Sequence, residues 1–205
     1  MQKNPFEALP ETVEIDGQAH AINCDFRFGI TLEQEVLSDR ETDVAGLLRL
    51  FYPDGVPRNV TAAVDKMLEF FKAPSSLLPS GKERDQTRKG RWYDFRQDAD
   101  VLLASFLDAY GIDLSTAKIH WWTFRLLMLN LPHETAFMQR VHYRTADISK
   151  VDKKLQPHYR KMRSIYALKD SGAGKSMTVE ERDAALKEKI RRRYEEAQQH
   201  GRNPS

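Results

Sequence analysis

The residues that could carry chemistry in this sequence are a glycine-lysine-serine run, scattered histidines and one pair of aspartates. Gly174-Lys175-Ser176 matches the end of a phosphate-binding loop, but that motif needs a glycine five positions before Gly174, where this chain has Lys169. A helical pattern precedes the run, whereas the motif requires a strand there. We therefore interpret the run as part of a hinge and not as a nucleotide site.

Histidines and acidic residues give no stronger catalytic pattern. The six histidines never form the helical i, i+4 pair with an intervening glutamate that a zinc protease requires. The single cysteine, Cys24, excludes an intrachain disulfide and offers no cysteine cluster for a metal. Asp94 and Asp98 share a predicted helix face, where they suit acid–base chemistry or a cation, but such pairs more often answer a nearby base such as Arg96 or Arg125. We expect no catalytic residue, no metal and no cofactor.

All three tryptophans lie within residues 91–150, on two consecutive helical patterns. In the first pattern, large apolar side chains recur every three or four residues from Trp92 until Gly111 supplies a left-handed stop. In the second, which Ser115 can cap and Pro132 ends, apolar residues leave almost no polar face. Such a helix belongs at the centre of a bundle, or it keeps one side for a protein partner.

Other periodicities complete a mainly α fold, a helical bundle with a small N-terminal β-hairpin and a C-terminal amphipathic helix. Asp16-Gly17 suits a two-residue turn, so a hairpin is predicted with Ile15 opposite Gln18. Helices are predicted from near Thr31 and over residues 43–52, 59–72, 133–145, 152–170 and 178–198. Pro157 is expected to break or kink the helix over residues 152–170.

The predicted organisation has three parts. Residues 1–24 form an N-terminal arm and the hairpin, residues 25–170 the helical bundle, and residues 171–205 a hinge and a helical tail. At 205 residues with 40% hydrophobic residues, the chain can bury a sizeable core. In the tail, Leu186, Ile190 and Tyr194 give an apolar stripe too narrow for a core helix. The tail is therefore expected to be a peripheral or partner-seeking arm.

Charge is distributed unevenly along the chain, although the formal net charge is only +2. Residues 150–205 carry 15 Lys and Arg against 8 Asp and Glu, whereas residues 1–149 carry 17 against 22. This asymmetry fits an acidic partner or nucleic acid at the C-terminal part, or mutual neutralisation of the two parts. No apolar run is long enough to span a membrane and no secretion signal is evident, so a cytoplasmic protein is expected.

Three runs of residues in the tryptophan-rich region are distinctive. They are Arg91-Trp92-Tyr93-Asp94-Phe95, Tyr110-Gly111-Ile112-Asp113-Leu114 and His120-Trp121-Trp122-Thr123-Phe124. Together with the hairpin and the segment from Phe137 to Arg144, they resemble the bacteriophage gene-product-fifteen protein family, found in tailed phages and prophages of Gram-positive bacteria. The likeness covers roughly residues 10–170.

The resemblance implies a non-enzymatic tail assembly chaperone in the bacterial host cytoplasm that is absent from the mature virion. Such a protein binds the phage tape measure protein and helps to recruit tail tube subunits, so the implied partners are the tape measure protein and the major tail protein. A homo-oligomer is an option, and no membrane is involved. A structural tail component, such as a connector or tube-completion protein, and a nucleic-acid-binding phage regulator are the alternatives.

The candidate site follows from how an aromatic groove could hold a helix with an apolar stripe. We predict that Trp121, Trp122 and Phe124 line or support a partner groove, and plain core packing is the alternative for these three residues. Arg125 or Arg140 would fix the register of the partner. The tail stripe of Leu186, Ile190 and Tyr194 would add reversible contacts.

Overall fold

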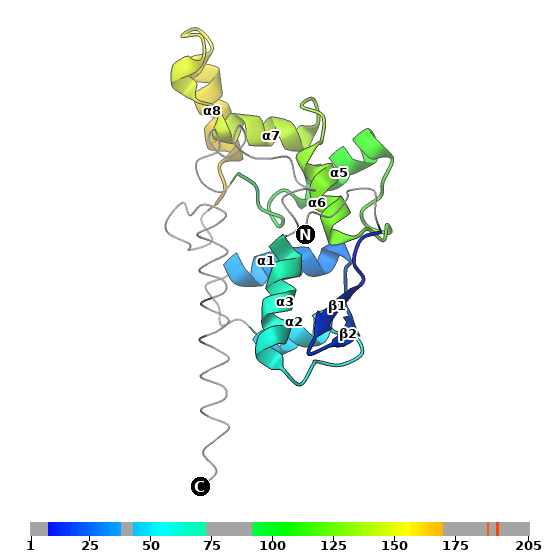
Figure 1. Ribbon diagram of the computed structural model, residues 1–205. Coiled ribbons are helices and arrows are strands. Elements are labelled where there is room, and N and C mark those ends of the chain that lie inside the picture. Colours follow the sequence, from blue (N-terminus) through cyan, green and yellow to red (C-terminus); the bar gives the residue numbers. More distant parts are fainter. Residues whose placement is uncertain (1–7, 38–42, 73–91, 170–187, 189–191, 193–205) are drawn as a thin grey trace. The chain divides into compact units, whose positions relative to one another are not determined.

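A computed structural model describes residues 8–37, 43–72 and 92–169, together with Glu188 and Arg192 (Figure 1). This part of the chain is mainly helical with one antiparallel hairpin near the N-terminus, as predicted. It forms two compact units. Unit 1 contains residues 8–37, 43–72 and 119–124 with Glu188 and Arg192, and unit 2 contains residues 92–118 and 125–169. Apart from Glu188 and Arg192, the helix predicted over residues 178–198 lies outside the described residues, and the division into arm, bundle and tail stays a prediction.

The hairpin of unit 1 consists of β1 (Thr12–Ile15) and β2 (Gln18–Ala21). Ile15 pairs with Gln18, which is the predicted register. Asp16 (φ 51°) and Gly17 (φ 76°) both adopt left-handed backbone conformations, because a two-residue hairpin turn of this kind needs positive φ at both central positions. The Asp16-Gly17 pair thus sets which side chains of the hairpin share a face.

The helices of unit 1 are α1 (Phe26–Leu37), α2 (Val44–Phe51), α3 (Val60–Lys72) and the first turn of α6 (Trp121–Leu129). The Asp43 carboxylate caps α2 by accepting the backbone N–H of Gly46 at 2.8 Å. Helix α2 packs against α1 and α3, and β1 packs against α3 (Figure 1). The side chains of Leu32, Phe51 and Met67 are completely buried in this core.

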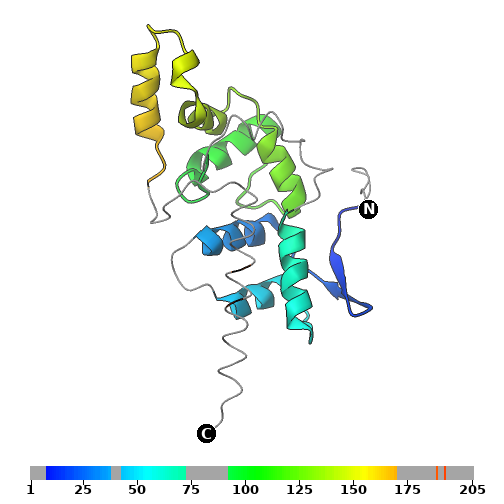
Figure 2. The same cartoon turned by 60° about the vertical axis from the view of Figure 1, so that its left-hand side comes forward.

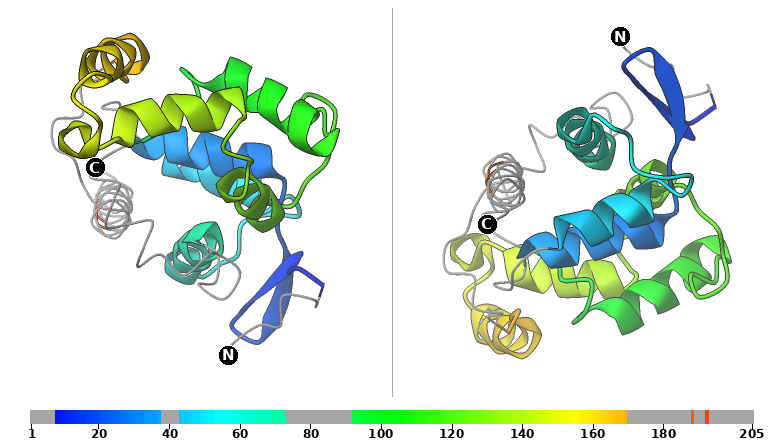
Figure 3. Two further views of the ribbon diagram at one scale, coloured as in Figure 1. Left: turned by 90° about the horizontal axis from the view of Figure 1, so that it is seen from above. Right: turned by 90° about the horizontal axis from the view of Figure 1, so that it is seen from below.

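Unit 2 contains α5 (Ala99–Tyr110), the rest of α6, α7 (Ala136–Thr145), the short 3-10 helix η1 (Ile148–Lys150) and α8 (Gln156–Tyr166). Helix α7 packs against both α5 and α8 (Figures 2 and 3). Phe106 of α5 and Phe137 of α7 are buried, and the backbone N–H of Phe137 donates to the Ser105 hydroxyl at 3.1 Å. Gly111 ends α5 in the left-handed conformation (φ 66°), as predicted.

Two helices begin at other residues than the sequence predicted. Helix α1 begins at Phe26 and not near Thr31, whose hydroxyl instead donates to the backbone carbonyl of Arg27 inside the helix. Helix α6 begins at Trp121 and not near Ser115, because the backbone of His120 pairs with that of Asp25 in an isolated β-bridge. Both errors have the same source, since an extended connection before α1 pairs with an extended connection before α6.

Two further predictions need correction, namely the start of the helix that was predicted to include Trp92 and the effect of Pro157 on its helix. Trp92 does not belong to α5, because residues 92–98 are non-helical and the helix begins at Ala99. Pro157 neither breaks nor kinks α8 but lies in its first turn, where a missing backbone N–H costs no intrahelical hydrogen bond. Within the described residues, every helix is too short or too polar to cross a membrane.

Candidate functional site

The start of α6 is fixed in unit 1 by backbone hydrogen bonds from a distant part of the sequence. The N–H of Trp121 donates to the carbonyl of Cys24 at 2.7 Å, and the N–H of Phe26 donates to the carbonyl of Ile119 at 2.9 Å. The His120 ring adds a further hydrogen bond, since its Nδ1 accepts the N–H of Trp122 at 3.1 Å. His120 therefore satisfies an N–H of the first turn of α6, as a capping residue does.

The Trp121 side chain lies in the core of unit 1, where 1% of the residue is exposed. Its indole stacks on the ring of Phe71 with centroids 5.3 Å apart and planes 11° apart. The other side of the site is closed by Gly29 of α1, where an added Cβ would overlap the indole ring atoms Cδ2, Cε2 and Cε3. Gly29 thus leaves the room that the indole fills.

The indole N–H groups of Trp121 and Trp122 cap the C-terminal end of α3. The Nε1 of Trp121 donates to the carbonyl of Phe71 at 2.8 Å, and the Nε1 of Trp122 donates to the carbonyl of Phe70 at 2.7 Å. These carbonyls belong to the last turn of α3, which ends at Lys72 and has no intrahelical donors left for them. The two consecutive tryptophans are therefore C-terminal caps of α3 as well as apolar filling.

Burial decides how the predicted groove residues are used in this structure. Trp122 is 6% exposed and Phe124 is completely buried, its ring stacking on Phe26 with centroids 4.7 Å apart. With Trp121, these residues offer almost no surface to a partner, so the structure favours the core-packing alternative for all three. They are placed to support the fold and not to line a surface.

Asp98 is the centre of a buried ion pair in unit 2. The residue is 1% exposed, and its two carboxylate oxygens accept from the guanidinium of Arg144 at 2.6 and 2.7 Å. The backbone N–H of Asp94 donates to the same carboxylate at 3.0 Å. Arg144 also donates to the carbonyls of Trp92 and Tyr166, so this one side chain joins α7 to the segment before α5 and to the end of α8.

The pair Asp94 and Asp98 is structural in this environment. The Asp94 carboxylate accepts the backbone N–H groups of Arg96 (2.7 Å) and Gln97 (2.9 Å), which holds the turn that leads into α5. Hence neither Arg96 nor Arg125 provides the base that the sequence suggested for Asp98. The arginine that does so is Arg144, 46 residues away.

Arg140, predicted to fix the register of a partner, is engaged within unit 2. Its guanidinium donates to Asp100 at 3.1 Å, lies 3.5 Å from a carboxylate oxygen of Asp98 and stands 5.8 Å from the ring centroid of Tyr166. Desolvation acts to raise the pKa of Asp100, but the backbone N–H of Val101 and the Arg140 guanidinium outweigh it, so the pKa is lowered. Arg140 thus stabilises the start of α5.

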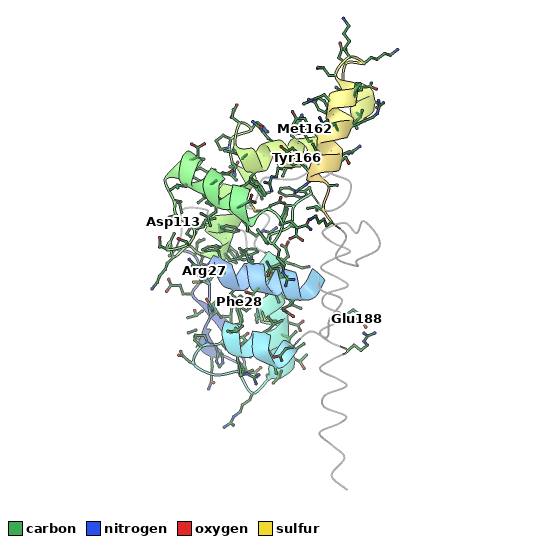
Figure 4. All side chains as sticks on the ribbon, turned by 180° about the vertical axis from the view of Figure 1, so that it is seen from behind. Arg27, Phe28, Asp113, Met162, Tyr166 and Glu188 are labelled. Atoms are coloured by element: carbon green, nitrogen blue, oxygen red, sulfur yellow. The ribbon has the colours of Figure 1, made fainter. Side chains whose placement is uncertain are left out.

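The contact between α7 and α8 is built from tyrosines and histidines. His142 Nε2 lies 3.1 Å from the Tyr159 hydroxyl, and His158 Nε2 lies 3.3 Å from the Tyr143 hydroxyl, so each helix contributes one residue to each pair. The Tyr166 ring lies 6.0 Å from that of Tyr143. Figure 4 labels Tyr166 and Met162 along α8, in which no residue is buried. Helix α8 is therefore held mainly by polar rings.

The remaining predicted site residues give no assembled site. Arg125 is half-buried in the part of α6 that belongs to unit 2, and Leu186, Ile190 and Tyr194 lie outside the described residues. Burial, followed by the nearby Glu11 carboxylate, raises the pKa of the half-buried Cys24 thiol. The described residues contain no group of three or more His, Cys, Asp or Glu side chains placed to hold a metal ion.

Exposed large apolar side chains are more numerous in unit 2 than in unit 1 among the described residues. Among the described residues, unit 1 contributes Leu50 of α2, which is 54% exposed. Unit 2 contributes five such residues: Leu103, Leu107, Leu126, Leu155 and Ile165. Leu103 and Leu107 are neighbours one turn apart on α5, and neighbouring exposed apolar side chains mark interaction surfaces more often than single ones do, so unit 2 is the better candidate for binding a partner.

The roles of two residues in the candidate site were missed in the sequence analysis. Gly29 makes room for the Trp121 indole, and Arg144 is the ion-pair partner of Asp98. For the first, Gly29 between Phe28 and Ile30 was an available signal only once α1 is known to begin at Phe26, since a glycine inside a helix usually reflects close packing. For Arg144, the signal was its spacing of four residues from Arg140, which places both guanidinium groups on one face of α7.

Comparison with known proteins gives one match. A family model described as Bacteriophage Gp15 protein matches residues 6–168, which agrees with the extent of the resemblance found in the sequence. No curated protein and no solved structure matches the chain significantly.

Proposed function

The chain belongs to the bacteriophage Gp15 protein family, and on this premise we propose that it is a non-enzymatic tail assembly chaperone. It binds the tape measure protein of the phage and helps to recruit tail tube subunits, the major tail protein among them. It acts in the cytoplasm of the bacterial host and leaves before the virion is complete. Membership in the family supports the broader role of a phage structural or assembly protein.

The observation that carries the proposal is the extent of the family match, from residue 6 to residue 168, which covers most of the described residues of both compact units. The predicted site residues described above contribute to core packing or to ion pairs within their unit. The two aspartates with the greatest catalytic promise in the sequence, Asp94 and Asp98, are occupied by backbone N–H groups and by Arg144. Their engagement supports a binding role over a catalytic one.

Because Trp121, Trp122 and Phe124 are buried, we place the proposed contact with the tape measure protein on residues that are exposed to solvent. On α6, Arg125 and Leu126 directly follow Phe124, and Leu126 is 37% exposed. A tape measure helix presents apolar stripes before the tail tube encloses it, and an exposed leucine can cover part of such a stripe. The tail stripe remains a further proposed contact.

Co-expression with the tape measure protein tests this function. The wild-type chain is expected to keep the tape measure protein in the soluble fraction and to co-purify with it. The substitution Leu126→Glu should lower the amount of soluble complex, whereas Leu50→Glu, at a similarly exposed leucine in unit 1, should not. The proposal fails if the tape measure protein is equally insoluble with and without the chain.

Mass spectrometry of purified virions separates the chaperone from a structural tail component. A chaperone that leaves the particle should be present in infected cells and lost from mature virions. A connector or tube-completion protein should remain in the virion at a fixed ratio to the other tail proteins, and that result would replace the present proposal.

One observation favours a second candidate, a nucleic-acid-binding phage regulator. Residues 150–169 carry seven Lys and Arg residues against one acidic residue, and tyrosines lie beside them on α8. Phosphates bind such clusters, and bases stack on such rings. Binding of single-stranded DNA that weakens steeply with added salt and depends on Arg160 and Lys161 would support this candidate.

A further inference from the structure

Both ring nitrogens of His120 have a partner on the protein backbone. Nδ1 accepts the N–H of Trp122 at 3.1 Å, and Nε2 lies 3.2 Å from the carbonyl oxygen of Pro10. Since a backbone N–H can only donate and a carbonyl oxygen can only accept, these partners assign the ring proton to Nε2 and the lone pair to Nδ1. The neutral imidazole in this tautomer satisfies both partners.

The imidazole joins segments of unit 1 that are far apart in the sequence. Pro10 precedes β1 and is separated from His120 by 110 residues, whereas Trp122 lies in the first turn of α6. The ring also meets that of Phe70 on α3 edge on, with centroids 5.4 Å apart and planes 69° apart. We refer to the hydrogen bonds of the ring with Trp122 and Pro10 as the His120 contact.

Protonation of the ring is incompatible with the His120 contact. The charged imidazole carries an N–H on both nitrogens, so its Nδ1–H would point at the N–H of Trp122. That N–H belongs to the first turn of α6, where no intrahelical carbonyl can accept it, so it would lose its acceptor. The ring can separate the two donors only by turning away from Trp122, and this turn also takes Nε2 away from Pro10.

Charged groups lie on each segment packed around the ring. Asp25 is opposite His120 in the β-bridge, and its carboxylate is already paired with Arg27 at 3.1 Å. The exposed Glu11 attracts a positive ring and the exposed Lys72 repels it, but interactions between exposed charges are weak. The loss of the acceptor for a helix N–H is therefore the larger effect. The charged or titratable groups on these segments are Glu11 before β1, Cys24 and Asp25 before α1, Lys66, Glu69 and Lys72 near the end of α3, and Lys118 before α6.

We propose that His120 is a pH-sensitive switch, which holds the segment before β1 on the start of α6 while its ring is neutral and releases it when the ring is protonated. In the unfolded chain a histidine takes up its proton with a pKa of about 6.5. Because the His120 contact disfavours this proton in the folded chain, the unfolded chain binds more protons, and stability falls as pH falls through about 6.5. If the folded ring stays neutral, this group alone raises the unfolding constant about tenfold between about pH 7.5 and 5.5.

NMR of the ring nitrogens in the full-length chain tests the tautomer directly. At neutral pH the nitrogen chemical shifts of His120 should report a proton on Nε2 and none on Nδ1. As the pH falls, the charged ring should appear together with a loss of exchange protection at the Trp122 amide, while the amides of α5 stay protected. The inference is overturned if Nδ1 carries the proton at neutral pH, or if the Trp122 amide stays protected once the ring is charged.

Urea unfolding of His120→Asn tests the effect on stability. Asparagine keeps an uncharged acceptor for the N–H of Trp122, as N-cap residues do, and it does not titrate. Over the same pH range, its unfolding constant should therefore rise by up to about tenfold less than that of the wild type. His133→Asn, at an exposed histidine, is the matched control and should keep the wild-type pH dependence. Equal pH dependence of the wild type and His120→Asn overturns the inference, and if His120→Asn does not fold, the ring shifts of the wild type decide alone.

Discussion

Replacing Gly29 by alanine should destabilise the protein, although the same change in an ordinary helix is stabilising. Gly29 lies inside α1, where alanine is normally favoured over glycine by about 0.5–1 kcal/mol. Here the added methyl group would overlap the indole of Trp121, so the ring or the helix must shift. Overpacking of this kind costs about 1–3 kcal/mol, which exceeds the gain in helix propensity.

The hydrogen bond made by Trp121 increases the expected loss. If the indole shifts, Nε1 moves from the Phe71 carbonyl, which it now contacts at 2.8 Å, and a lost hydrogen bond costs about 1 kcal/mol more. We therefore expect Gly29→Ala to lower the free energy of unfolding by about 1–3 kcal/mol after the propensity gain is subtracted. The loss should be largest if α1 resists bending.

Urea unfolding followed by far-ultraviolet circular dichroism measures this free energy. Two further variants isolate the cause. Ala45→Gly, on the exposed side of α2, gives the intrinsic difference between the two residue types in this protein, about 0.5–1 kcal/mol. In a Trp121→Leu background the clash is gone, so Gly29→Ala should become neutral or stabilising. The reasoning is refuted if Gly29→Ala alone is as stable as the wild type, or if its effect is the same in both backgrounds.

Three other substitutions test the buried polar groups. Asp98→Asn should lower the free energy of unfolding by about 3–5 kcal/mol, because it leaves Arg144 buried without its carboxylate. Adding Arg144→Met should recover part of this loss. Equal losses in the single and double variants would contradict the ion-pair explanation. Tyr52→Phe should cost about 1 kcal/mol, since the hydroxyl donates to the Ala63 carbonyl at 2.8 Å. Burial raises the pKa of Tyr52 above its ordinary 10.0, so the tyrosine ionises first in the unfolded chain and the stability of the protein should fall as pH rises beyond 10. The midpoints of urea unfolding should fall less with pH for Tyr52→Phe than for the wild type. Identical pH profiles would argue against this role of Tyr52. Trp122→Ala should lower the thermal midpoint with a loss of about 3–5 kcal/mol, whereas an unchanged midpoint with lost tape measure binding would restore the groove role of this residue.

Features encoded by neighbouring residues were predictable from the sequence. Asp16-Gly17 specified the hairpin and its register, Asp43 marked the start of α2, and Gly111 marked the end of α5. In each case the physical cause is a local backbone requirement, namely positive φ or a side chain that satisfies an N–H of the first helical turn. The family resemblance was equally local, because it rested on short aromatic runs, and the family match confirms it.

Features that depend on distant residues were not predictable in the same way. The start of α6 is set by the bridge between His120 and Asp25, and the Asp98 carboxylate is satisfied by Arg144, 46 residues further along. A periodic pattern also cannot separate an aromatic that lines a groove from one that fills a core, since both recur at helical spacing. Trp121 needed the position of Gly29 on another helix before its role could be assigned.

The absence of any buried residue in α8 has a consequence for the order in which the protein opens. A helix that can detach without uncovering core surface has a small opening free energy, so its backbone amides should exchange with deuterium sooner than those of α5 or α7. The Arg144 contact with the Tyr166 carbonyl anchors only the last turn. Helix α8 should therefore open before the rest of unit 2, once the contacts of Tyr159 and His158 with α7 have broken.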